Sequence, residues 1–145
     1  MTVPYNSEFS QLIGNEDAVM ANRISALWNG SITGTGVAAT LIPANASYYA
    51  YVKGLYLHLS MDATLATAGE NTITVQAGAK IIFQDIVYIP AAAITVPEYK
   101  LILDDFEYIT SAANVAITAN ISTALATGVL TAAVKGGYTA LTLGD

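Results

Sequence analysis

From Val37 onward, hydrophobic residues recur at every second position in short runs that Gly, Pro and Asn residues separate. A period of two is typical of β-strands, whose successive side chains point to opposite faces of a sheet. The strongest run covers residues 48–60, and both of its faces are largely apolar, so we expect both to be covered. Its two predicted faces are Tyr49, Tyr51, Lys53, Leu55, Leu57 and Leu59 on one side, and Tyr48, Ala50, Val52, Gly54, Tyr56 and His58 on the other.

Other segments of the chain have the same alternation, and turn residues lie between them. We predict strands at 37–42, 72–77, 80–89, 101–109, 115–122, 129–134 and 138–143. Residues 69–71 are predicted as a turn, and Gly136 and Gly137 separate the last two strands. Strands do not alternate with helices, which excludes the α/β classes. The predicted fold is mainly β, an antiparallel β-sandwich or jelly roll of about eight strands.

The N-terminal segment has a different pattern, which predicts a short helix. Asn15 is a good N-cap, and Asn29 followed by Gly30 is a plausible C-terminal stop. Residues 30–36 are small and uncharged and are predicted as a hinge. We therefore divide the chain into an arm, 1–36, and a β-sandwich domain, 37–145. The arm can dock on its own sandwich or on a neighbouring subunit, and the sequence leaves both open.

The chain has few charges for its size, and this limits its partners. Of its 145 residues, 11% are charged and 54% are hydrophobic, and the formal net charge is −6. Because five Lys and Arg face eleven Asp and Glu, nucleic acid is not an expected partner. The charge-free stretch 108–134 reads as strands and turns, so a membrane is not expected either. A surface with so little charge is poorly protected from association, and we infer that much of it meets other protein.

No catalytic or metal-binding constellation emerges, and we predict neither an enzyme nor a cofactor. His58 is the single histidine; it lies in a strand without a nucleophile elbow nearby, and we interpret it as a packed or hydrogen-bonded strand residue. Cys residues are absent. The acids Asp104, Asp105 and Glu107 are interpreted as a solvated rim, with an ion site as the alternative.

Tyrosine is unusually frequent, with nine Tyr against three Phe and one Trp. Tyr offers a large contact area with a polar tip, which suits surfaces that become buried on assembly. Tyr48, Tyr49, Tyr51 and Tyr56 cluster in one predicted strand. They fit a core edge, a subunit interface or a face that stacks on carbohydrate.

The β region resembles small structural proteins of tailed bacteriophages. The resemblance rests on VAATLIPANAS, YYAYVKGLYLHLSMDA, TITVQAGAKIIF and VAITANISTALATGVLTAAVKGGY, and covers about residues 35–143. These proteins include head decoration (cement) proteins with a jelly-roll or TNF-like sandwich. The resemblance implies a trimer on the capsid exterior of a virion made in the host cytoplasm, bound to the major capsid protein and often engaging neighbours through an N-terminal arm.

The leading hypothesis is therefore a non-enzymatic virion protein that self-associates and stabilises a capsid lattice by burying surface. The alternative is a tail-fibre or adhesin tip that binds carbohydrate through exposed Tyr. The residues predicted to contact partners are the apolar residues of the arm: Phe9, Leu12, Ile13, Val19, Met20, Ile24, Leu27 and Trp28.

Overall fold

The computed structural model describes residues 26–32, 38–92 and 99–140, and this part of the chain forms nine β-strands. The strands are β1 (Ala26–Ile32), β2 (Ala39–Ile42), β3 (Tyr49–Leu59), β4 (Gly69–Ala77), β5 (Lys80–Ile89), β6 (Tyr99–Leu103), β7 (Tyr108–Ile109), β8 (Ile117–Ile121) and β9 (Leu130–Thr139). The prediction of a mainly β chain is confirmed.

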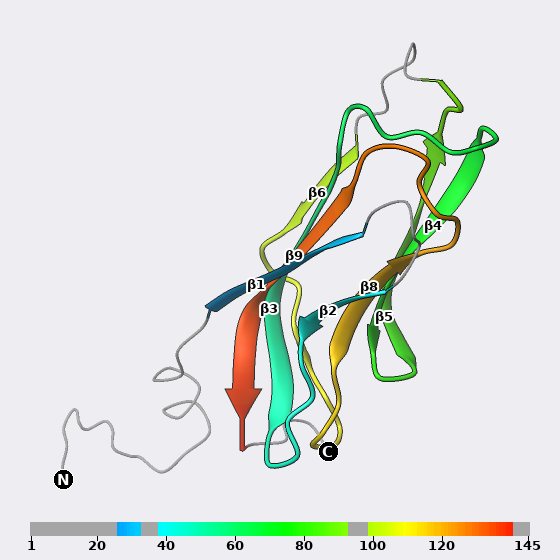
Figure 1. Cartoon of the computed structure of the whole chain (residues 1–145). Coiled ribbons are helices and arrows are strands. Elements are labelled where there is room, and N and C mark those ends of the chain that lie inside the picture. The colour runs from blue at the N-terminus through cyan, green and yellow to red at the C-terminus, as the bar shows by residue number, and fades with distance from the viewer. Residues whose placement is uncertain (1–25, 33–37, 93–98, 141–145) are drawn as a thin grey trace, which may run out of the picture.

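The strands form two antiparallel sheets (Figure 1). The first sheet has the order β1-β9-β3-β6, with β7 also paired to β3, and the second has the order β2-β8-β4-β5. Only β4 and β5 are hydrogen-bonded neighbours that also follow one another in the chain, and their short turn includes Gly78 at a φ of 61°. All other pairings join strands that are distant in sequence.

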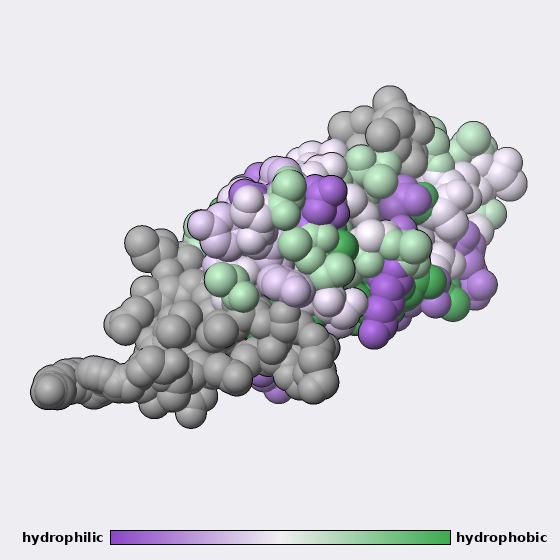
Figure 2. Space-filling view, turned by 90° about the horizontal axis from the view of Figure 1, so that it is seen from below, coloured by the Kyte–Doolittle hydropathy of each residue, from purple (hydrophilic) through white to green (hydrophobic). Residues whose placement is uncertain are grey.

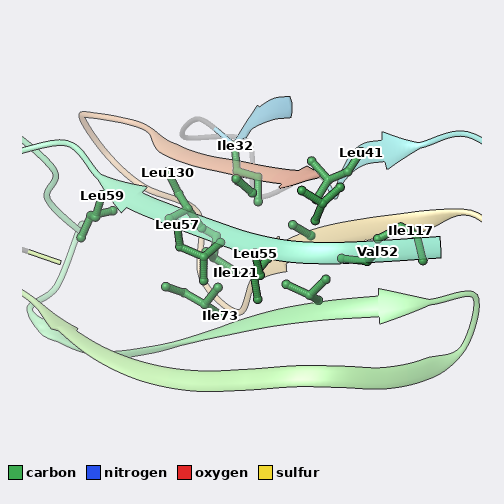
Figure 3. Packing of buried hydrophobic residues seen from close by; sticks show 14 of the residues in the cluster. Ile32, Leu41, Val52, Leu55, Leu57, Leu59, Ile73, Ile117, Ile121 and Leu130 are labelled. Atoms are coloured by element: carbon green, nitrogen blue, oxygen red, sulfur yellow. The ribbon is translucent and has the colours of Figure 1, made fainter. Parts of the chain in front are cut away.

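The hydrophobic core lies between the inner faces of the two sheets (Figure 3). Leu55 and Leu57 of β3 point from the first sheet toward Ile73 of β4 and Ile121 of β8 in the second, and Leu59 lies further along β3 in the same core. These side chains are at most 3% exposed. Truncating such a Leu to Ala costs about 2–5 kcal/mol, because a cavity remains where the side chain was.

A β-bulge in β3 corrects the predicted division of its faces. The register with β9 shifts between Val52 and Gly54, so Lys53 is an extra residue. Ala50 and Val52 therefore share the core with Leu55, Leu57 and Leu59, although strict alternation assigned them to opposite faces.

Three predicted boundaries are also wrong. Residues 69–71, predicted as a turn, begin β4, and Asn71 is buried. The run 101–109 is divided into β6 and β7 by a turn at Asp104 and Asp105. Residues 130–139 form one strand, which passes through Gly136 and Gly137 without a break.

The N-terminal prediction is wrong where the structure describes it. Ala26–Ile32 is a strand paired with β9 along its whole length, not the end of a helix followed by a hinge. A short helix with one apolar stripe is only marginally stable by itself, whereas as a strand these residues pair with β9 along their whole length. The remaining residues of the predicted helix lie outside the described residues.

Candidate functional site

His58 lies exposed on the outer face of the first sheet, which corrects its interpretation as a packed or hydrogen-bonded strand residue. Its side chain is exposed, and its direct cross-strand neighbours are Thr131 of β9 and Lys100 of β6. No hydroxyl or carboxylate within the described ranges is hydrogen-bonded to its ring.

An open hollow of about 250 Å³ lies beside His58 on this face. One cross-strand row across it is Thr131, His58 and Lys100, and the next row is Ala133, Tyr56 and Ile102. The hollow forms because β9 contributes small side chains between larger ones. Its exposed lining is apolar, although polar residues such as His58 and Lys100 contribute to it.

Tyr56, which lies in the second of these rows, forms a hydrogen bond with Asp104. The phenol of Tyr56 donates to Oδ1 of Asp104 over 3.0 Å. This bond, together with burial and the negative charge of Asp104, raises the pKa of Tyr56 above its ordinary value. The Asp104 carboxylate is therefore held against the outer face of the sheet, next to Ile102.

The acidic residues after β6 do not converge. Asp104, Asp105 and Glu107 are all exposed, and within the described residues no group of three Asp, Glu, His or Cys side chains is placed to hold a metal ion. In the same part of the chain, no helix is long and apolar enough to cross a membrane.

Asp85 and Tyr99 connect the edge strands of the two sheets. The phenol of Tyr99 in β6 donates to Oδ2 of Asp85 in β5 over 2.9 Å, and the backbone N–H of Ile86 donates to Oδ1 over 2.9 Å. Burial, followed by the bond to Asp85, raises the pKa of Tyr99 well above its ordinary value. The rings of Phe83 and Phe106 meet edge to face at 6.4 Å and also link β5 to the segment after β6.

The outer face of the second sheet is almost free of charge. Its strands β2, β8 and β4 present Thr40, Thr118, Asn120, Thr72, Thr74 and Gln76. Glu70 is the one acid or base among the described residues in these cross-strand rows. Much of the surface visible in Figure 2 likewise has the pale colours of residues near the middle of the hydropathy scale.

Beside these polar residues, the edge strand β5 exposes large hydrophobic side chains on the same face. Ile81, Ile86 and Tyr88 are 51%, 58% and 60% exposed. Their cross-strand neighbours are Gln76, Thr72 and Glu70. This concentration of exposed hydrophobic residues on one strand differs from the scattered single residues that are normal on soluble proteins.

Two of the predicted contact residues lie in β1. Leu27 is 62% exposed. Trp28 is half-buried; its Nε1–H donates to the carbonyl of Gly136 over 2.9 Å, and its ring meets that of Tyr138 at 5.8 Å. The other six, Phe9, Leu12, Ile13, Val19, Met20 and Ile24, lie outside the described residues.

The tyrosines of the β3 region do not form one exposed face. Tyr51 is fully buried, Tyr49 and Tyr56 are half-buried, and Tyr48 is exposed. Tyr88 is more exposed than any of these four, and it lies on β5 instead.

Sequence reasoning missed the residues that stand out on the surface of the structure. These are Ile86 and Tyr88 on β5, and Lys100 and Ile102 on β6. The alternation of 80–89 contained the first pair. The spacing of Lys100, Ile102 and Asp104 contained a second signal, since every other residue of a strand faces the same side.

No protein-family model and no curated protein sequence matches this chain. Among solved structures, the chain is similar to one from a cryo-EM structure of virus-like particles of the extra small virus of the giant freshwater prawn, Macrobrachium rosenbergii. The two chains are 10% identical, and the match covers 88% of this chain and 82% of the other with a TM-score of 0.34. The proposal that follows is therefore argued from the surface residues of this chain.

Proposed function

We propose that this protein is a non-enzymatic structural protein of a virus particle. In this proposal copies of the chain self-associate, as a trimer, and the assembly stabilises a phage capsid from outside by binding the major capsid protein. The trimer, the exterior position and this partner come from the resemblance of the β region to head decoration proteins. The self-association is supported by the surface of the chain itself.

The proposal takes the sandwich as a jelly roll. Apart from the two-residue β7, the strands can be taken in consecutive pairs, and in each pair one strand belongs to the first sheet and the other to the second. These pairs are β1 and β2, β3 and β4, β5 and β6, and β8 and β9. Jelly rolls occur in viral capsid proteins, but also in lectins and cupins. Because a fold does not determine a function, the surface must discriminate among these classes.

The observation that carries the proposal is the outer face of the second sheet. It combines uncharged Thr, Asn and Gln side chains with the exposed Ile81, Ile86 and Tyr88 of β5. Fully burying a large hydrophobic side chain contributes about 1.5–3 kcal/mol, and these three, which are about half exposed, have roughly half of that left to gain before association costs. Uncharged polar neighbours are also cheaper to desolvate than ions. Such a face suits permanent contact with protein, and repeated contacts in a lattice raise the overall affinity.

Sedimentation velocity of the full chain, from low micromolar to near-millimolar concentration, tests this proposal. We expect species larger than a monomer, and we expect Ile86→Lys with Tyr88→Glu to weaken their association by at least about tenfold. Met61→Lys is the matched control, because Met61 is 58% exposed but lies in the turn after β3. A wild-type chain that stays monomeric throughout would contradict the proposal.

A second candidate is carbohydrate binding at Tyr88, as in an adhesin tip. The observation in its favour is an exposed ring beside the carboxylate of Glu70, its cross-strand neighbour. Such a pair offers a stacking platform and a hydrogen-bond acceptor. A glycan-array signal that Tyr88→Ala abolishes would support this candidate, while an array without signal would count against it.

A further inference from the structure

β6 is an edge strand with an unpaired side. In the first sheet it pairs with β3 over Tyr99–Leu103, and no other described strand pairs with it. An edge strand presents backbone N–H and C=O groups that can pair with a strand of another chain. Proteins use this mode of recognition for partners that add a strand to a sheet.

The outward side chains of β6 and of the residue that follows it form a pattern of charge, hydrophobic group and opposite charge. Lys100 is exposed and lies opposite the outward-facing His58, and Ile102 is 59% exposed and lies opposite Tyr56. Asp104 is on the same face, because its Oδ1 accepts the hydrogen bond of the Tyr56 phenol.

We propose that β6 pairs antiparallel with β6 of a second copy about a two-fold axis at Ile102. The positions two residues before and two residues after the axis are then directly opposite one another. Lys100 of each copy therefore faces Asp104 of the other, and the two Ile102 side chains meet between the two ion pairs. The two first sheets become one continuous sheet across the pair of copies.

The charges also select this alignment over the others. A parallel arrangement would place Lys100 opposite Lys100 and Asp104 opposite Asp104, which is repulsive. A shift of two residues would bring Ile102 opposite Asp104 of the second copy and break both ion pairs. A shift of one residue would bring outward side chains opposite inward ones.

This inference rests on the proposed function in one respect, since it names a contact by which the proposed self-association occurs. A two-fold contact joins two copies, whereas the resemblance implies trimers. If the trimer contact and the β6 contact both form, β6 links one trimer to the next, and the linked trimers form an extended network. The contact uses the first sheet and is separate from the outer face of the second.

Charge exchange in the full chain tests the contact. We expect Lys100→Glu and Asp104→Lys, each alone, to raise the dissociation constant of the two-fold pair by at least about tenfold in sedimentation equilibrium. The variant with both changes restores both ion pairs with reversed sign and should return to within a few-fold of the wild type. Lys135→Glu, which changes an exposed lysine of β9, is the control for net charge.

A cross-linking variant keeps the proposal testable if a charge variant fails to fold. Because the chain has no Cys, Ile102→Cys introduces a single thiol that the axis brings close to its copy. With diamide as oxidant, we expect a disulfide-linked dimer in much higher yield than for Met61→Cys. Equal yields, or an exchanged variant as weak as the single ones, would overturn the contact. If only the Ile86 and Tyr88 changes weakened association, the β6 contact would fail while the proposed function stood.

Discussion

At the scale of single residues, Asn71 shows how one buried amide joins two segments. It is fully buried; its Nδ2 donates to the carbonyl of Thr123 over 2.8 Å, and its Oδ1 accepts from the backbone N–H of Thr123 at 2.9 Å. The hydroxyl of Ser122 also donates to Oδ1, over 2.6 Å. Asn71 was predicted as a turn residue because Asn is common in turns. Its actual role depends on Ser122 and Thr123, which a local pattern cannot reveal.

Asn71→Ala should lower the free energy of unfolding by about 2–4 kcal/mol, because it leaves a backbone N–H and C=O of Thr123 without their partner. Chemical denaturation followed by circular dichroism measures this loss. Gln84→Ala is a suitable control, since its exposed amide makes one long bond of 3.4 Å to Thr74. Equal losses for the two variants would contradict this account of Asn71.

Tyr99 gives the fold a specific sensitivity to alkaline pH. Burial and the bond to Asp85 raise the pKa of its phenol in the folded state, so the unfolded chain loses this proton at lower pH than the folded one. The stabilisation is complete below the ordinary pKa of Tyr and declines as pH rises through and above it. At neutral pH, Tyr99→Phe should be less stable than the wild type by about 1 kcal/mol. When the pH is raised above the ordinary pKa of Tyr, the free energy of unfolding should fall less for the variant than for the wild type. Parallel denaturation curves for both proteins at these pH values would check this, and identical pH dependence would contradict it.

At the scale of elements, periodicity located most strands but not their partners. The boundaries of β5 are the predicted ones, 80–89, because its alternation is long and Gly78 and Pro90 lie on either side of it. The residues of β3 before and after Lys53 were assigned to the wrong faces relative to each other, because a bulge depends on the opposing strand and not on the local alternation. The helical spacing of Trp28 with the residues before it was misleading, because pairing of Ala26–Ile32 with β9 overrides local preference.

Beside this bulge in β3, the paired residue of β9 must be a glycine, Gly136. A Cβ at this position would collide with the carbonyl oxygen of Tyr51. Gly136→Ala should therefore lower the free energy of unfolding by about 3 kcal/mol or more. Gly69→Ala is the matched control, because a Cβ there meets no atom within 4 Å, and its effect should stay within about 1 kcal/mol. Thermal unfolding of both variants distinguishes the cases, and a harmless Gly136→Ala would contradict the described bulge.

At the scale of the whole molecule, the two outer faces differ in the side chains that they present to solvent. The first sheet presents His58 and Lys100 in one cross-strand row, and Asp104 lies beyond the next row, where Tyr56 holds it. The second presents uncharged polar groups and the hydrophobic residues of β5, which favour burial. The shortage of charge was evident in the composition and predicted association. Its location on particular faces was not, because strand order is set by pairings between distant segments.

Hydroxyl-radical footprinting of the full chain, dilute and assembled, tests the central claim that other protein covers the outer face of the second sheet. We predict that oxidation of Tyr88 falls several-fold on assembly, while that of Met61, which is similarly exposed in the single chain, changes little. Oxidation of Tyr88 at the same rate in the dilute and assembled protein would contradict the claim.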